Sequence, residues 1–403
     1  MTTRGAGPPV VRRRAMLIGA AATLAASACT DGPDPDPTVP DGSDDILVGV
    51  SLELTGPASA LGVLQERALR ITAEQLNTER VPVGATRRGL RLVVRDNIGQ
   101  AGTATTVARQ LIEQDRVHAL IGGTLAETSL ATIAVAQDRQ LPMISLANAD
   151  GIVRPRSRRT FVYKVAPDAG DVASRLVRTI ARQKLRRVAA LATTGPYGDS
   201  GMRATQEAID AAGLDLVRAV RLPTAVGELP AAARRLTDAA PEAMVIWATA
   251  PAAGNIARAM RTAGFAGRFF FDAGAVAEAT LSGATAAAVE GAYVVHPAML
   301  DTSALTNTTL AGLARRAFVF RYIQLHGSFK GFAPYASDAL TMITAAARRA
   351  GNLEPGPLRD HLENMTIEGI AGSYAFSPDH HGGMGADSLA LFTVERGAWA
   401  RVS

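Results

Sequence analysis

The sequence has very little cysteine and few aromatic residues. Cys29 is the only cysteine among 403 residues, so no intramolecular disulfide can form. Aromatic residues make up 5% of the chain, whereas 47% of it is hydrophobic and rich in alanine. The apolar residues are spread too evenly for an integral membrane protein, and the composition is ordinary for a soluble α/β protein. A chain of this length can form two domains with sizeable cores.

The small excess of positive charge lies at the N-terminus. Arg4, Arg12, Arg13 and Arg14 all precede Cys29, and no acidic residue does. Without these four arginines the formal net charge falls from +5 to +1. The rest of the chain therefore has neither the basic excess of a nucleic-acid-binding protein nor a polybasic patch for a membrane surface.

The sequence also lacks the short motifs of several enzyme classes. It contains no G-x-S-x-G nucleophile turn, no G-x-x-x-x-G-K-[ST] phosphate loop and no H-E-x-x-H zinc motif. Any ATP hydrolysis linked to this chain would therefore belong to another subunit. His380 and His381 are adjacent, and we expect a solvated turn there because adjacent side chains rarely coordinate the same metal ion. We predict no catalytic residue, no metal and no cofactor.

The first 28 residues are typical of a signal peptide. A short apolar run from Ala15 to Ala28 follows the arginines and ends in small residues. The run is too short for a permanent membrane span. Cys29, directly after it, resembles the lipid-acceptor cysteine of bacterial lipoproteins, although Ala26 stands where leucine is usual. The alternative is export by the Sec or twin-arginine route with cleavage at an Ala-x-Ala site, in which case Cys29 is incidental.

Residues 29–45 are expected to form a lipidated cysteine followed by a tether. From Thr30 to Asp45 the chain consists of Asp, Pro, Gly, Ser and Thr with one valine. Such a segment cannot bury apolar surface, so we predict that it is disordered, acidic and extended. A lipid at Cys29 would then hold a globular body just off a membrane surface.

Strands and helices alternate after the tether. The stretch from Ile46 to Gly62 is predicted to be a strand, a loop and the start of a helix. Further predicted strands in the first half are Leu90–Arg95, Ala119–Ile121 and Pro142–Ser145, and helical periods lie at 61–71, at 104–112 and from about Thr128 or Ser129. The loops are short, so the sheet should be parallel with right-handed crossovers.

The alternation restarts near Asp168. The predicted strands of the second unit are Val188–Thr193, Leu214–Arg221, Met244–Ala248 and Arg268–Phe271. Helices are expected near 172–180, at 197–213, 228–239 and 253–263, and later at 316–324 and 339–349. We expect strand Ala292–Val295 to lead back towards the first unit and short strands to end the chain. The pattern predicts two similar α/β lobes.

Several short motifs recur in one order from about residue 46 to the C-terminus. The early ones are Val48-Gly49-Val50, Leu54-Thr55-Gly56-Pro57, Leu61-Gly62, Ala108-Arg109-Gln110-Leu111-Ile112, Gly122 and Pro142-Met143-Ile144-Ser145. The later ones are Tyr197-Gly198, Pro241-Glu242-Ala243 and Glu290-Gly291-Ala292-Tyr293. Together, in this order and spacing, they resemble the type I periplasmic binding proteins of the leucine/isoleucine/valine group.

The resemblance implies an α/β fold class with two similar Rossmann-like lobes, whose parallel sheets are joined by a three-stranded hinge. The crossings would lie near Asp168, His296 and Ala375. The implied lobes are 46–167 with 296–375 for lobe 1, and 168–295 with 376–403 for lobe 2.

The resemblance also implies a function. Such a protein is the solute-binding receptor of an ABC importer, here a lipoprotein on the extracytoplasmic face of the cell membrane. It would be a monomer that closes like a hinge on a small solute and delivers it to permease subunits, with no nucleic acid involved. The solute would carry a carboxylate, as a branched-chain or other amino acid does, or would be amide-like.

The implied binding site lies between the lobes. Helix N-termini and loop N–H groups carry partial positive charge, which suits an anionic group such as an α-carboxylate. The resemblance places ligand-binding residues at Leu61, Thr124, Ala126, Thr128, Ser129, Ala147 and Asn148 in lobe 1, and at Tyr197, Thr249 and Asp272 in lobe 2.

The chain departs from the family at several of these positions. The family's carboxylate-binding serine falls at Ala126 and its paired threonine at Ala149, while a further aromatic residue falls at Thr249. Its acidic residue for an α-ammonium falls one or two places after Asp272. An amino-acid site would therefore have to be rebuilt, from Thr124, Thr128, Ser129, Asn148 and Asp272.

Structural alternatives remain open for individual residues. Thr128 and Ser129 are good N-cap types and would stand at a helix start whether or not a ligand binds. Tyr197 could equally be an aromatic at the edge of the core.

Two other functions also remain open. A sensor that reports the solute to a membrane signalling partner would have no importer genes beside its own. A secreted α/β enzyme would need a base paired with a nucleophile, which the expected cleft does not offer.

Overall fold

The computed structural model describes residues 44–223, 228–301, 305, 308–329 and 331–402. The predicted signal peptide, Cys29 and nearly all of the predicted tether lie outside the described residues. Asp45, the last residue of that tether, is buried beside Gly89, and strand β1 begins at the next residue. None of the helices in the described part of the chain combines the length and apolar character that a membrane crossing needs.

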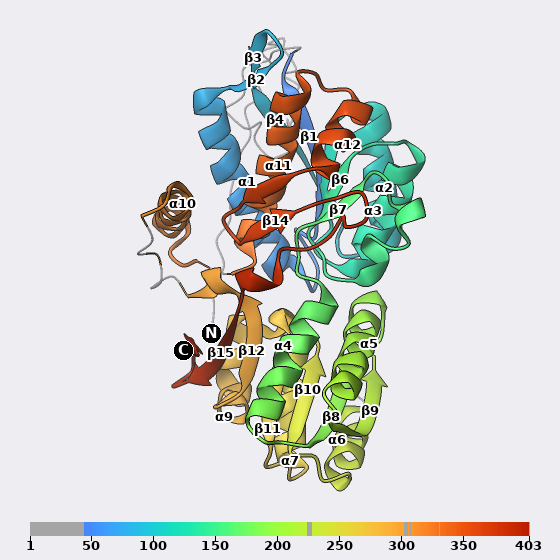
Figure 1. The fold of residues 1–403 in the computed structure, drawn as a ribbon, viewed down its shortest axis with the longest axis vertical. Coiled ribbons are helices and arrows are strands. Elements are labelled where there is room, and N and C mark those ends of the chain that lie inside the picture. The colour runs from blue at the N-terminus through green and yellow to red at the C-terminus, as the bar shows by residue number, and fades with distance from the viewer. Residues whose placement is uncertain (1–43, 224–227, 302–304, 306–307, 330, 403) are drawn as a thin grey trace, which may run out of the picture. The chain divides into compact units, whose positions relative to one another are not determined.

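The first sheet has five parallel strands in the order β4-β1-β5-β6-β7 (Figure 1). Their bounds are Ile46–Leu52 for β1, Leu90–Asp96 for β4, Ala119–Gly122 for β5, Met143–Ser145 for β6 and Val162–Lys164 for β7. Almost every residue of β1 is buried, as expected for a strand covered by helices on both faces.

Two pairs of helices cover this sheet. On one face α1 (Ser59–Glu79) packs against α11 (Ala333–Ala350), and on the other α2 (Ala101–Arg109) packs against α3 (Ala126–Asp138). The last turn after α2 widens into a short π-helix, Gln110–Gln114. Helix α10 (Leu310–His326) lies beside α1.

The second sheet has seven strands in the order β16-β15-β12-β11-β10-β8-β9. Its parallel strands are β8 (Arg187–Thr193), β9 (Asp215–Leu222), β10 (Ala243–Trp247), β11 (Arg268–Phe271) and β12 (Tyr293–Pro297). The C-terminal strands β15 (Leu389–Glu395) and β16 (Ala398–Arg401) join it antiparallel.

Helices also cover both faces of the second sheet. Helices α4 (Ala169–Arg182) and α5 (Pro196–Ala211) share one core cluster, whereas α6 (Leu229–Asp238) and α7 (Ala252–Thr262) share the other. Two one-turn helices, α8 (Glu278–Leu281) and α9 (Ala286–Val289), follow β11. The predicted fold class, two α/β lobes with parallel sheets, is confirmed.

Sequence periodicity predicts most of the helices and strands but not the shortest strands. Arg268–Phe271 is a strand with the predicted bounds. The hairpin β2 (Val81–Val83) with β3 (Thr86–Arg88), and strand β7, were missed because three residues show no alternation. Helix α12 (Pro355–Glu363) was also missed. After it, β13 (Thr366–Glu368) pairs with β14 (Ser373–Ala375) in an antiparallel hairpin.

Helices α10 and α11 are longer than predicted. The expected segments were 316–324 and 339–349, whereas the helices begin at Leu310 and Ala333. Large apolar side chains on α10, among them Leu310 and Phe320, are exposed, so its sequence shows no single apolar face from which to read the start.

The segment after β14 remains close to the first sheet before the chain reaches the second. The backbone N–H of Lys164, in β7, donates to the carbonyl of His381, and the N–H of Gly383 donates to the carbonyl of Lys164. The loop 377–385 therefore packs on lobe 1, although the implied boundary assigned it to lobe 2. The division into lobes otherwise stays a prediction.

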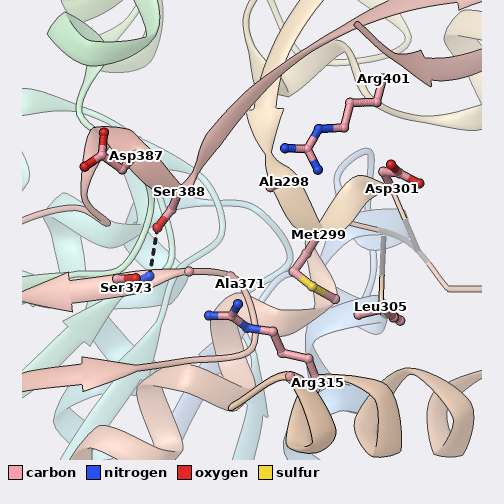
Figure 2. A pocket seen from close by; sticks show the side chains of 12 residues that line it. Ala298, Met299, Asp301, Leu305, Arg315, Ala371, Ser373, Asp387, Ser388 and Arg401 are labelled. Carbon is pink, nitrogen blue, oxygen red and sulfur yellow. Dashed lines mark hydrogen bonds between the residues drawn. The ribbon is translucent and has the colours of Figure 1, made fainter. Parts of the chain in front are cut away.

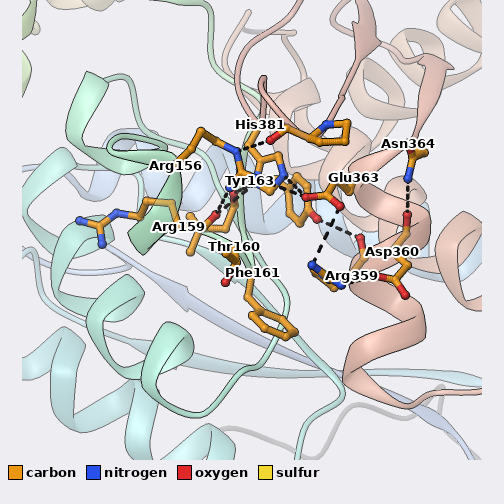
Figure 3. Close-up of polar contacts among 12 residues, drawn as sticks. Arg156, Arg159, Thr160, Phe161, Tyr163, Arg359, Asp360, Glu363, Asn364 and His381 are labelled. Carbon is orange, nitrogen blue, oxygen red and sulfur yellow. Dashed lines mark hydrogen bonds and ion pairs between the residues drawn. The ribbon is translucent and has the colours of Figure 1, made fainter.

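The predicted solvated turn fits His380, which is exposed, but the prediction is wrong for His381. Its side chain is buried and stacks on Tyr163, with ring centroids 4.2 Å apart (Figure 3). Nδ1 lies 2.9 Å from the carbonyl of Val162, and Nε2 lies 3.1 Å from Glu363 Oε1, which Arg156 also contacts at 3.0 Å. Burial lowers the pKa of His381. No group of three metal-ligating side chains occurs among the described residues.

Candidate functional site

The residues predicted to bind a ligand follow the carboxyl ends of parallel strands in both sheets. In open α/β sheets this edge is where ligands bind. The two edges are in contact: Ser200 Oγ, in α5, accepts a hydrogen bond from the backbone N–H of Asp150 at 3.0 Å, and Arg203 forms an ion pair with the Asp150 carboxylate. Tyr197 packs into the hydrophobic cluster that contains Ala126, Ala147 and Ala149 of the first lobe.

Helix α3 begins earlier than predicted. Its first residue is Ala126 and its N-cap is Leu125, so Thr128 and Ser129 lie inside the first turn and neither caps it. Both are fully buried. Ser129 Oγ hydrogen-bonds Ser145 Oγ, and Thr128 Oγ1 lies 3.0 Å from the carbonyl of Leu125. The capping interpretation of these two hydroxyls is therefore wrong, and both are used within the protein.

Glu53 holds the start of α3, and sequence reasoning missed it. It directly follows β1 and is fully buried. Its carboxylate accepts the backbone N–H of Thr124 at 2.9 Å and that of Leu125 at 3.3 Å. The hydroxyl of Thr128 and the amide of Asn97, the latter at 3.4 Å, also donate to it. The N–H of the cap residue Leu125 and that of the preceding Thr124 are thus bonded to a carboxylate of the protein.

Thr124 and Gln65 form a second polar contact in the first lobe. The Thr124 hydroxyl donates to Gln65 Oε1 at 2.6 Å. Gln65 is fully buried in α1, and its Nε2 has no hydrogen-bond partner among the described residues. Leu61, in the first turn of the same helix, is partly exposed.

The loop after β6 offers mainly small apolar surface. Ala147 and Ala149 are buried in the cluster that also holds Ala126. Asn148 lies between them, and its Oδ1 is buried without a partner in the described part of the chain. The hydroxyls of the family pattern are therefore replaced by methyl groups, with one amide oxygen available.

The second lobe contributes a bonded pair, Tyr197 and Asp272. The Tyr197 hydroxyl donates to Asp272 Oδ2, which also accepts the N–H of Gly274 at 2.8 Å. Burial raises the pKa of Asp272 to about 7 and raises that of Tyr197 well above its usual range. Asp272 Oδ1 has no partner within the described ranges. This pair confirms that the two residues lie together; their role in ligand binding stays a prediction.

Trp247 and Tyr335 flank this pair. The Trp247 ring lies 6.0 Å from that of Tyr197, and its Nε1 is buried without a described partner. Tyr335, from α11 of the first lobe, is buried, and its hydroxyl also lacks a partner among the residues described. Burial, with the Asp338 and Asp272 carboxylates nearby, raises the pKa of Tyr335.

Thr249, which was predicted to bind a ligand, lies just before α7. Its carbonyl accepts the N–H of Ala253, in the first turn of that helix.

The chain matches the family model described as periplasmic binding protein over residues 45–398. The chain belongs to this family. An amino acid binding protein of Pseudomonas aeruginosa is 22% identical over 332 residues, which cover 81% of this chain and 85% of that protein. Among solved structures, an extracellular ligand-binding receptor of Rhodopseudomonas palustris HaA2 is 23% identical with a TM-score of 0.79, covering 89% of this chain and 99% of the other.

A leucine binding protein of Thermotoga maritima MSB8 has the same fold. It is 20% identical, with a TM-score of 0.78, and the match covers 89% of this chain and 98% of the other. The names of these relatives describe proteins that bind an amino acid, leucine or an extracellular ligand. At these identities the structures establish the fold, whereas the ligand depends on the residues of the site.

Two surface pockets of this periplasmic binding protein lie apart from the candidate site. One, of about 260 Å³, lies beside α10 and β16, and its lining includes Arg315, Arg401 and Asp387 (Figure 2). The other, of about 430 Å³, lies beside the loop that carries His381 and is lined partly by Arg154 and Arg156. None of the predicted ligand-binding residues lines either pocket.

The pKa of Asp272 predicts how stability depends on pH. Because burial raises this pKa from about 4 to about 7, the folded state keeps a proton that the unfolded state has lost, and stability falls as pH rises across this interval. Asp272→Asn removes the free-energy cost of ionising this buried carboxyl group. We expect the variant to unfold at a higher temperature than the parent at pH 8, by on the order of 1–3 kcal/mol in free energy, with a smaller difference at pH 5.

Thermal unfolding without ligand at both pH values measures this effect. Asp138→Asn, at an exposed position on α3, is the matched control and should leave the profile unchanged. A difference between Asp272→Asn and the parent that is the same at pH 5 and pH 8 would contradict the assignment.

Proposed function

We propose that this periplasmic binding protein is the solute receptor of an ABC importer, with no catalysis of its own. The observation that carries the proposal is a set of buried polar atoms without partners among the described residues, contributed by both lobes. They are Gln65 Nε2, Asn148 Oδ1, Trp247 Nε1, Asp272 Oδ1 and Tyr335 Oη. Buried polar groups are normally satisfied, so a polar solute that meets several of them at once gains free energy.

The relatives support this reading. One is named an amino acid binding protein and one a leucine binding protein. Small-molecule sites combine an apolar lining with a few placed polar groups, and the alanines 126, 147 and 149 beside Tyr197 supply such a lining. We propose that solute binding and lobe closure occur together, because the site contains residues from both lobes.

A thermal-shift screen of the mature protein tests the function. The panel contains amino acids, amino-acid amides, short peptides, aliphatic and aromatic carboxylates, simple amides and sugars. A ligand at about a hundred times its dissociation constant adds ~2.7 kcal/mol to the native state, which is a shift of a few degrees for a body of this size. Failure of every class, together with a hydrolytic or transfer activity on any of them, would favour a secreted enzyme instead.

The ion pair between Arg203 and Asp150 predicts an effect on closure. Arg203 lies on α5 and Asp150 follows β6, so the pair joins the lobes. Arg203→Ala should weaken the binding of the best ligand from the screen about two- to fivefold, because half of the arginine side chain is exposed and the pair is partly screened. Titration calorimetry measures the affinity.

Glu207→Ala is the matched control for Arg203→Ala. Glu207 contacts the same guanidinium at 2.9 Å but lies one turn further along α5, within a single lobe. Its removal should leave affinity unchanged. Equal losses in both variants would mean that the arginine acts within α5 and not across the lobes.

We also propose that export is followed by lipidation of Cys29 and that the body is held at the extracytoplasmic face of the membrane. The proposal rests on the signal-like segment and on a cysteine directly after it. Cells grown with a palmitate analogue should label the wild-type protein and the control Ser43→Ala, whereas Cys29→Ser should be unlabelled and released from the membrane fraction. An N-terminus at an unmodified Cys29 in the wild type would establish simple cleavage instead.

A further inference from the structure

We infer that α10 is a dimerisation helix, whose outer apolar face packs against the same face of a second copy of this chain. The two helices lie antiparallel about a twofold axis at Ala317. This surface contains none of the predicted ligand-binding residues, so the inference holds or fails independently of the proposed receptor function. It differs from the monomer that the family resemblance implies.

The first step is the exposed apolar surface of α10. Among the described residues, six large apolar side chains are exposed, and five of them lie on this helix. They are Leu310, Leu313, Phe320, Ile323 and Leu325, with 86% of Leu310 and 65% of Phe320 exposed. Large apolar side chains that gather on one surface mark an interaction site, whereas single ones scattered over a surface do not.

The second step is that α10 is apolar on two opposite faces. Its inner face packs on the first lobe beside α1 (Figure 1), where Phe318 and Tyr322 are buried in one hydrophobic cluster. The exposed residues of the outer face, spaced by three and four, are Leu310, Leu313, Ala317, Phe320 and Gln324. A helix that is apolar all round is normally buried on all sides. The described part of the chain leaves the outer face uncovered, so the face fits a partner.

The third step is the match of the outer face to itself. Its three- and four-residue spacing is the one by which two helices pack side by side. Ala317 stands at the centre of the face, with Leu313 on one side and Phe320 on the other. When a second helix runs antiparallel through the same centre, Ala317 faces its own copy on the axis, and each Phe320 packs beside Leu313 of the partner subunit. A twofold interface of this kind uses the same residues on both copies.

The fourth step is the charge beside the face. The guanidinium of Arg315 lies 3.0 Å from the Glu368 carboxylate. That of Arg321 lies 3.1 Å from Glu74, and Arg316 has a partner in the chain as well. A helix that lies on an anionic membrane carries free basic side chains beside its apolar face. Since the arginines of α10 are paired within the chain, the face is complementary to a second uncharged apolar face and not to lipid headgroups.

The exposed apolar area sets the strength of the dimer. The five exposed side chains of α10 supply roughly half of the ~800 Å² that each partner buries in a standard interface. Smaller neighbours on the same face add to this area. An interface at the small end of the range holds a weak dimer, so we expect a dissociation constant on the order of 1–100 μM.

Sedimentation velocity of the exported Cys29→Ser protein, which has no lipid attachment site, tests the dimer. The sedimentation coefficient should rise with concentration across the micromolar range. Phe320→Asp should raise the dissociation constant about tenfold or more, because it buries a charge in the interface. Its melting temperature in dilute solution should equal that of the parent, since Phe320 is exposed in the monomer.

Ile98→Asp is the matched control for Phe320→Asp. Ile98 is the sixth exposed large apolar side chain of the described residues and lies in the loop after β4. Its replacement should leave the association unchanged. A wild type that stays monomeric throughout, or an association that Phe320→Asp does not weaken, would overturn the inference.

A disulfide tests the position of the axis. Packed helices lie about 8–10 Å apart with Cα atoms about 2.3 Å from each helix axis, so residues facing each other on the twofold have Cα atoms roughly 4–5 Å apart, within reach of a disulfide. Because Cys29 is the only cysteine, Ala317→Cys in the Cys29→Ser protein leaves one thiol in each chain. Air oxidation should yield a covalent dimer, whereas Ala181→Cys, at an exposed position of α4, should stay largely monomeric. Equal yields from the two variants would contradict the predicted axis.

Vesicles of phosphatidylglycerol test the lipid alternative. The Cys29→Ser protein should not sediment with them. Binding to these vesicles that Phe320→Asp abolishes would assign the face to the membrane and overturn the dimer. Either result leaves the receptor function untouched, because the thermal-shift screen measures it separately.

Discussion

The first lobe depends on the burial of one carboxylate. Glu53 joins three segments that are distant in the sequence: the end of β1, Asn97 after β4, and the start of α3. A buried charge is tolerated only where donors replace its hydration, and here four donors from these segments do so. The orientation of the loop from Thr124 to Thr128 follows from this requirement.

The second lobe contains a buried carboxylate that is only partly hydrogen-bonded. Asp272 has one oxygen bonded to Tyr197 and Gly274 and the other without a partner in the described structure, and burial holds its pKa near 7. A carboxylate that is fully bonded inside the protein has little left to offer a ligand. An incompletely bonded carboxylate gains most from a new donor, which is why Asp272 stays the predicted ligand-binding residue of the two, whereas Glu53 is bonded within the protein.

The sequence predicts the framework of the site better than its chemistry. Alternation of strands and helices places the loops at the carboxyl ends of β1, β5, β6, β8 and β11. The sequence also predicts Tyr197 and Asp272 at one site, and the two side chains are hydrogen-bonded to each other. Glu53, Gln65 and Tyr335 were not named, because an acidic residue after a strand, an amide inside a helix and a tyrosine near a helix start look like surface residues until the tertiary structure buries them. The hydroxyls of Thr124 and Thr128 bond Gln65 and Glu53, partners that no sequence pattern indicates, and the ligand-binding role of the two threonines stays a prediction.

The unpartnered atoms also explain why binding and closure should be coupled. Tyr335 from α11 is buried close to Asp272, which follows β11, and each has a polar atom that lacks a partner in the described chain. If the lobes open and close as proposed, closure without a solute would leave these atoms desolvated with no compensating hydrogen bonds. A solute that hydrogen-bonds them would remove that cost only in the closed arrangement. It would then shift the equilibrium towards closure by its differential affinity for that state.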